Sequence, residues 1–100
     1  MIFRTKTKDY YGWTALEIVR AMESDARDYP HRGQSIKQFL RWSLNRLGDR
    51  LPHRELDLSS RLEDETLALS FLHLCDEYGA GKIIRMPKKF KNRTPTLKQG

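Results

Sequence analysis

Apolar residues recur every three or four positions in the N-terminal third of the chain, the spacing of one face of an amphipathic helix. They are Ala15, Ile18, Val19, Met22, Ala26 and Tyr29. Thr14 and Glu17 have the spacing of a capping box, in which each side chain satisfies a free backbone N–H of the first turn. Because Pro30 disfavours helical backbone before it, we expect this helix to end near Asp28.

A second helix is predicted from Ser35 to Leu47, with Gly48 as its C-terminal stop. Ser35 and Gln38 suit another capping box. The expected buried stripe consists of Ile36, Phe39, Leu40, Ser43 and Leu47.

The third predicted helix runs from Ser60 to Tyr78, and Gly79 closes it. Ser60 and Glu63 have the capping-box spacing again. Its apolar residues are Leu62, Leu67, Leu69, Phe71, Leu72, Leu74, Cys75 and Tyr78. They point in nearly every direction around the helix axis. A helix that is apolar almost all round is packed on several sides, so we expect this one at the centre of the fold.

The segments at the two ends of the body are short, and the second is β-prone at Ile83 and Ile84. We expect residues 2–7 and 82–86 to pair as a short two-stranded ribbon beside the helices. Residues 49–59 form a long connection, and its three leucines, Leu51, Leu56 and Leu58, are expected to pin it to the core.

These elements predict a mainly α fold, a three-helix domain around a central apolar third helix. We expect a single domain over residues 1–86 and a basic tail over residues 87–100. The tail contains few apolar residues and many lysines, which is typical of a chain that does not fold alone.

Charge divides the chain unevenly. Residues 1–81 carry 12 basic and 13 acidic side chains, whereas residues 82–100 carry seven basic side chains and no acid. A cationic end attracts polyanions: nucleic acid, an acidic protein surface or anionic lipid. The alternatives are a solubilising terminus that binds nothing specific, and a tail that packs on the acidic third helix of its own chain. Phe90 lies among these cations, where a ring can stack on a base while lysines meet phosphates. The candidate contacts here are Lys82, Arg85, Lys88, Lys89, Phe90, Lys91 and Arg93.

The second predicted helix is also cationic on its outer side, where Lys37, Arg41 and Asn45 fall four residues apart and share a face. Lys37 and Arg41 are therefore further candidate contacts. The alternative is a solvated face that complements the acidic stretch of residues 55–81, and we favour it over recognition of a DNA groove. A helix-turn-helix needs a turn of three or four residues, and residues 29–34 are longer than that.

Aromatic and cationic residues also alternate near the N-terminus, around Lys6, Lys8, Tyr10, Tyr11 and Trp13. This pattern suits single-stranded nucleic acid, on which aromatic rings stack. Alternatively, the rings cover the start of the first helix, with Trp13 and Ile18 as a hydrophobic staple. We retain Tyr10 and Tyr11 as candidate contacts.

Catalytic and metal-binding signatures are weak throughout the sequence. The only cysteine, Cys75, lies on the most apolar helix, where we expect a buried and inert thiol. No second cysteine completes a tetrahedral metal site with His73, and residues 79–82 lack the spacing of a phosphate-binding loop. We therefore expect no enzyme activity, no cofactor and no metal.

Two functions remain open from the sequence. The first is a small non-enzymatic protein that binds nucleic acid through its cationic tail. The second is a protein-interaction module, an adaptor, inhibitor or complex subunit, whose tail docks on an acidic partner. One cysteine and the lack of a secretory signal make the cytoplasm the expected compartment, and the longest apolar stretch is too short to span a membrane.

Overall fold

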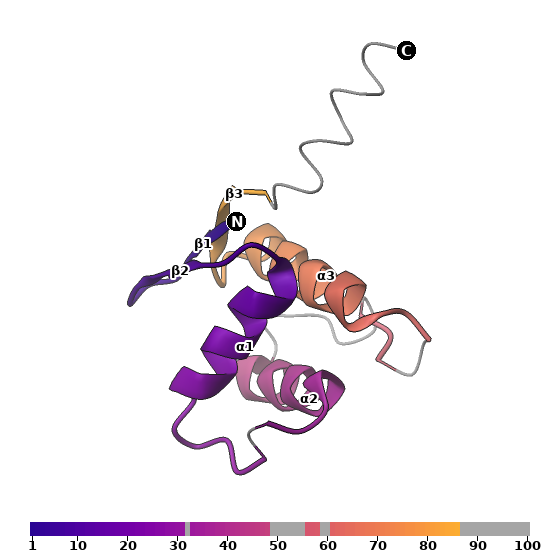
Figure 1. Ribbon diagram of the computed structural model, residues 1–100. Helices are drawn as coiled ribbons and strands as arrows, with labels where there is room; N and C mark the ends of the chain where they lie inside the picture. The colour runs from indigo at the N-terminus through magenta and orange to yellow at the C-terminus, as the bar shows by residue number, and fades with distance from the viewer. Residues whose placement is uncertain (32, 49–55, 59–60, 87–100) are drawn as a thin grey trace, which may run out of the picture.

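A computed structural model describes residues 1–31, 33–48, 56–58 and 61–86. Along the chain, its elements are β1 (Ile2–Arg4), β2 (Asp9–Tyr11), α1 (Ala15–Asp25), α2 (Ile36–Leu47), α3 (Asp64–Glu77) and β3 (Lys82–Arg85). The three predicted helices are present, and a small antiparallel sheet lies at one end of them (Figure 1). None of the helices in these described ranges has the length and apolar content needed to cross a membrane.

The two ends of the described chain pair as expected, but they belong to a three-stranded sheet, one strand more than the predicted ribbon. The sheet has the strand order β2-β1-β3, and both pairings are antiparallel. The unexpected strand β2 returns from β1 through a tight turn. In that turn the hydroxyl of Thr5 accepts hydrogen bonds from the backbone N–H groups of Thr7 and Lys8, at 3.3 and 3.2 Å. A Thr side chain therefore organises this hairpin, which lacks the Asn-Gly or Asp-Gly pair that marks hairpins in sequences.

Helix α1 begins as predicted, because the Thr14 hydroxyl accepts a hydrogen bond from the Glu17 N–H at 3.1 Å. The other half of the capping box differs, since the Glu17 carboxylate accepts from the N–H of Trp13 at 2.6 Å. Trp13 is 71% exposed, so the predicted staple against Ile18 is not formed.

The end of α1 was predicted near Asp28, and the helix ends three residues earlier, at Asp25. Glu23 is 3% exposed and accepts hydrogen bonds from the Arg20 guanidinium at 3.1 Å and from the Gly33 N–H at 3.3 Å. The bond from Gly33 holds the following turn back against the helix. Tyr29 lies in that turn, and its ring packs against aromatic residues of α2.

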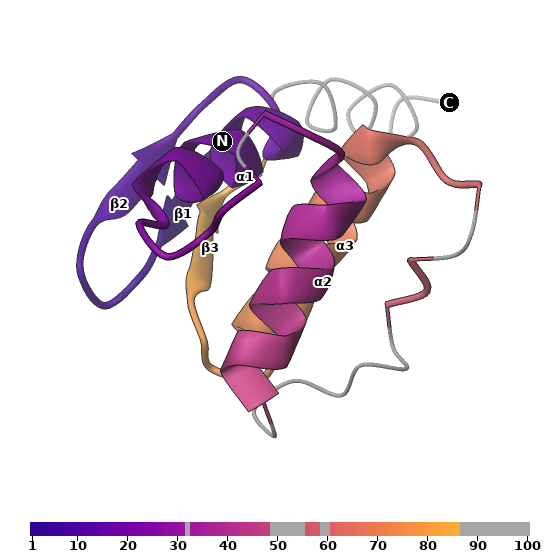
Figure 2. The same cartoon turned by 90° about the horizontal axis from the view of Figure 1, so that it is seen from below.

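Helix α2 has the predicted limits, but the capping box predicted between Ser35 and Gln38 is replaced by a different cap. Its N-cap Ser35 accepts a hydrogen bond from the Lys37 N–H at 3.2 Å, and Gly48 follows with a φ of 59°. Its buried side chains are Ile36, Phe39, Leu40, Ser43 and Leu44. Figure 2 shows α2 lying along α3.

Helix α3 is central as predicted, since it contacts α1, α2 and β3 and buries residues on several sides. Its predicted start is wrong. The helix begins at Asp64, and Glu63 is an N-cap without a side-chain hydrogen bond. Ser60, the expected cap, lies outside the described residues. In the first turn, the Glu65 carboxylate accepts hydrogen bonds from α1 instead, at the N–H groups of Ala15 (3.0 Å) and Leu16 (2.8 Å).

The long connection before α3 reaches the core through Leu56, which is buried, and Leu58, which is partly buried. Leu51 lies outside the described residues, as does the whole of the predicted tail from residue 87.

Candidate functional site

The register of the sheet brings three residues from its three strands into one row. Ile2 of β1 pairs with Tyr11 of β2 on one side and with Arg85 of β3 on the other. Directly paired residues project from the same face of a sheet. The Tyr11 ring, the Ile2 side chain and the Arg85 guanidinium therefore share a face.

A second row on the same face contains Asp9, Arg4 and Lys82, paired in that order across the strands. The row between these two points the other way. It contains Tyr10, which is 9% exposed, and Phe3, which is fully buried. We call the side that carries Tyr11, Ile2, Arg85, Asp9, Arg4 and Lys82 the outer face, because the opposite side packs on the core.

The only carboxylate in these two rows is held by a guanidinium. Arg4 donates from Nε to Oδ1 of Asp9 at 2.9 Å and from Nη2 to Oδ2 at 3.1 Å. This hydrogen-bonded pairing with Arg4 lowers the pKa of Asp9, and a hydrogen bond with Tyr11 lowers it further. The reciprocal hydrogen bond with Asp9 raises the pKa of Arg4. The pair has no net charge, so the outer face takes its charge from β3.

The two cations of β3 have no opposing charge of this kind. Lys82 and Arg85 are exposed, and no carboxylate among the described residues forms an ion pair with either. Tyr11 is 69% exposed, and Trp13, two residues further on, adds a second exposed ring. An aromatic ring beside cations can stack on a base while the cations contact phosphate groups.

The free edge of β3 is partly occupied by its own chain. The Ile83 N–H donates to the Asp76 carboxylate of α3 at 2.8 Å instead of pairing along the strand. Ile84 is the extra residue where the register with β1 shifts, and it is 42% exposed. A blocked and irregular edge is a poor template for adding another strand, so side chains are the available means of binding.

The predicted contact residues divide into four groups. Tyr11, Lys82 and Arg85 come together on the outer face. Tyr10 does not join them, because alternation along β2 turns its ring inward and its hydroxyl donates to Asp25 at 2.9 Å. The prediction that Tyr10 is a surface contact is therefore wrong.

The remaining candidates belong to α2 and to the predicted tail. Lys37 and Arg41 are on α2, which packs on α3 away from the sheet (Figures 1 and 2). The tail candidates, Lys88, Lys89, Phe90, Lys91 and Arg93, lie outside the described residues. Their segment follows β3 directly in the chain, so it is covalently joined to the outer face.

Three residues of the outer face were not among the sequence candidates: Ile2, Arg4 and Asp9. Arg4 and Asp9 each follow or precede a buried residue, and this alternation could have identified them. It indicates an exposed face only once β1 and β2 are recognised as strands.

The remaining chemistry-bearing residues of the described ranges lie in separate local contacts. The Asp25 and Asp28 carboxylates each form an ion pair, with Lys8 at 2.9 Å and with Arg46 at 3.0 Å respectively. No group of three possible metal ligands is found in this part of the chain. Cys75 is 3% exposed, which confirms its predicted burial, and this burial raises the pKa of the thiol to about 12.

Comparisons with protein-family models, with curated proteins and with solved structures found no match to this chain.

Proposed function

We propose that this protein binds single-stranded nucleic acid, without catalysing a reaction, through the outer face and the basic segment that follows it. In this proposal Tyr11 stacks on a base, and Lys82 and Arg85 contact phosphate groups. The observation that carries the proposal is the shared row of Tyr11, Ile2 and Arg85. Tyr11 and Arg85 stand two strands apart, roughly 10 Å at the usual strand spacing.

Single strands are favoured over duplexes because of what the outer face offers. A ring at the protein surface stacks on a base only when that base has left its own stack. Duplex recognition in the major groove uses a protruding helix or a two-stranded ribbon. The exposed cations of α2 do not meet that need, since the connection between α1 and α2 spans residues 26–35 and exceeds a helix-turn-helix turn.

The tail contributes charge in this proposal. Residues 87–100 add five basic side chains and no acid, directly after β3. Each phosphate contact releases counterions, so binding weakens as salt rises, with a slope of about −0.7 per contact for single strands. A segment with many such cations increases affinity without distinguishing one sequence from another.

The proposal is tested by fluorescence anisotropy with mixed-sequence single- and double-stranded oligonucleotides at two salt concentrations. The full chain is compared with Arg85→Gln, with Lys82→Gln and with a chain lacking residues 87–100. Arg41→Gln is the matched control, because it removes an exposed cation from α2. We expect tighter binding to single strands, weaker binding for all three test variants, and no change for the control.

Two results would overturn the proposal. Equal losses for Arg85→Gln and Arg41→Gln would show that only net charge matters. No binding to any oligonucleotide at low salt, together with binding to polyglutamate, would favour the alternative function as a protein-interaction module for an acidic partner.

A further inference from the structure

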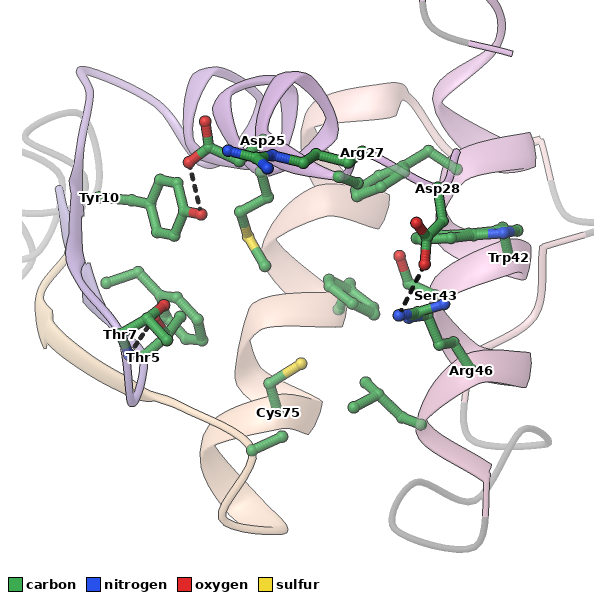
Figure 3. A pocket seen from close by; sticks show the side chains of 17 residues that line it. Thr5, Thr7, Tyr10, Asp25, Arg27, Asp28, Trp42, Ser43, Arg46 and Cys75 are labelled. Atoms are coloured by element: carbon green, nitrogen blue, oxygen red, sulfur yellow. Dashed lines mark hydrogen bonds and ion pairs between the residues drawn. The ribbon is translucent and has the colours of Figure 1, made fainter. Parts of the chain in front are cut away.

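A pocket of about 520 Å³ lies against the inner side of the β1–β2 hairpin, opposite the outer face. Figure 3 shows the hairpin on one side of this pocket and α2 on the other, with the end of α1 above and α3 behind. Its volume is in the range of roughly 300–1,000 Å³ that is typical of small-molecule sites. No part of the proposed function uses this pocket.

The interior of the pocket is apolar and firmly held. Phe3 and Phe71 line it and belong to the fully buried core, so their rings are fixed by packing on both sides. Phe39 lines it as well and is also buried, whereas Met22, Trp42 and Leu47 are only partly buried and supply the accessible apolar wall. Cys75 contributes a neutral thiol, because burial raises its pKa to about 12. This interior suits a flat apolar group.

The carboxylates at the mouth are already paired. Asp25 accepts hydrogen bonds from Lys8 Nζ and from the Tyr10 hydroxyl, both at 2.9 Å. Asp28 pairs with Arg46 of α2 at 3.0 Å. A cationic ligand would therefore have to displace an existing ion pair to reach either carboxylate.

Arg27 is the remaining charged residue that lines the pocket. It is exposed, and it forms no ion pair with any of the described residues. Figure 3 shows its side chain extending along the mouth, over the apolar interior. A guanidinium without a partner carboxylate offers a fork of N–H donors that fits a carboxylate, sulfonate or phosphate group.

We propose that this pocket binds a small organic anion with a flat apolar body. The body lies against Met22, Trp42 and Leu47, which line the pocket and are only partly buried, and the anionic group pairs with Arg27. Because Tyr10 and Tyr11 alternate along β2, the pocket and the outer face lie on opposite sides of that strand. The two sites can be occupied together, so this proposal stands or falls independently of nucleic-acid binding.

The test uses two fluorescent probes with the same aromatic body. 8-Anilinonaphthalene-1-sulfonate carries an anionic group, and N-phenyl-1-naphthylamine lacks it. With the full chain we expect saturable binding of one sulfonate probe per molecule. Arg27→Gln is expected to weaken the sulfonate probe at least fivefold and to change the neutral probe less than twofold. Arg41→Gln, which removes a cation from outside the pocket, is expected to change neither.

The position of the probe is checked without relying on a substitution. The chain has three methionines: Met1, Met22 and Met86. Only Met22 lines the pocket. In a spectrum of ¹³C-methyl methionine, ring currents of the bound naphthalene are expected to shift the Met22 signal most, assigned with a Met22→Leu variant. The Met86 signal is expected to stay in place.

Three results would overturn this proposal. The first is binding that does not saturate or that exceeds one probe per chain. The second is an equal effect of Arg27→Gln on both probes, which would remove the role of the anion. The third is a Met22 signal that does not move while the probe is bound, which would place the probe elsewhere.

Discussion

The Glu65 carboxylate of α3 accepts a hydrogen bond from the backbone N–H of Leu16 in α1, at 2.8 Å. Its other oxygen accepts from the Ala15 N–H at 3.0 Å. The first turn of a helix leaves N–H groups without partners, and α1 finds two of these partners on another helix. This contact joins two segments that lie 49 residues apart in sequence.

Replacing this carboxylate should destabilise the fold. Glu65→Ala leaves two partly buried N–H groups without acceptors, and we expect it to lower the free energy of unfolding by about 1–3 kcal/mol. Urea denaturation measures the change. Glu63→Ala is the control, because the Glu63 side chain makes no cap hydrogen bond at the start of α3. Equal losses for the two variants would contradict the role given to Glu65.

Gly81 lies where α3 connects to β3, with no room for a side chain. A Cβ atom there would overlap Cζ of Phe3 and lie 2.7 Å from Cε2 of the same ring and 3.1 Å from the carbonyl oxygen of Arg4. Phe3 is fully buried and cannot move aside cheaply. We expect Gly81→Ala to lower the free energy of unfolding by about 1–3 kcal/mol, measured by urea denaturation.

The Gly81 effect can be separated from a backbone effect by a double-mutant cycle with Phe3→Leu. If the clash with the ring is the cause, Gly81→Ala should cost less when leucine occupies position 3. The same cost in both backgrounds would show that the ring is not responsible.

Helix limits that are set by residues next to them in sequence could be predicted. The limits of α2 follow from Ser35 and Gly48, which act on their own helix. The predicted start of α3 was wrong. It was based on the spacing of Ser60 and Glu63, which does not reveal that the Glu65 carboxylate accepts hydrogen bonds from the first turn of α1. Strand β2 has three residues and exists through its pairing with β1, so its own periodicity was too short to reveal it.

The candidate site shows the same limit. Tyr10 and Tyr11 are adjacent and chemically identical, yet one is 9% exposed and the other 69% exposed. Composition cannot separate two such residues. Only their place on a strand does so, because alternation sends one ring inward and the other outward. Lys82 and Arg85 were chosen for charge alone, and their position beside Tyr11 required the register of β3 on β1.

Stability should fall at alkaline pH through Cys75. The ordinary pKa of this thiol is 9.0, and burial raises it to about 12. Between these values the unfolded chain loses the thiol proton while the folded chain keeps it. The folded state then binds more protons, so the free energy of unfolding falls as pH rises, by up to about 1.4 kcal/mol per pH unit.

Tyr10 also lowers the free energy of unfolding as the pH rises, starting at a slightly higher pH. Burial, together with the hydrogen bond to Asp25, raises its pKa from 10.0 to about 12. We therefore expect Cys75→Ala to abolish the decrease in the free energy of unfolding that starts near pH 9. The decrease due to Tyr10, which starts near pH 10, should remain. Urea denaturation at a series of pH values measures both slopes. Identical profiles for the two proteins would contradict the burial of the thiol.

Removing the carboxylate of the outer face should improve nucleic-acid binding. Asp9→Asn abolishes the ion pair with Arg4 and leaves that guanidinium available for phosphate. At low salt we expect several-fold tighter binding of a single-stranded oligonucleotide. We also expect a salt slope steeper by about 0.7, the value for one added phosphate contact. Anisotropy titrations at several salt concentrations measure both quantities.

The matched control is Asp28→Asn, which makes the same change in net charge and releases Arg46 from its ion pair away from the sheet. Its effect on binding should be much smaller than that of Asp9→Asn. An equal gain for both variants would show that binding responds to net charge rather than to the outer face.

The affinity of Tyr11 variants for a single-stranded oligonucleotide tests the account most directly. Tyr11→Phe keeps the ring, and Tyr11→Ala removes it from an exposed position where folding is little affected. Stacking on one base contributes about 1–3 kcal/mol, so we expect Tyr11→Ala to bind about 5- to 150-fold more weakly than Tyr11→Phe. Equal affinities of the two variants, at a salt concentration where the unmodified chain binds, would contradict base stacking on the outer face.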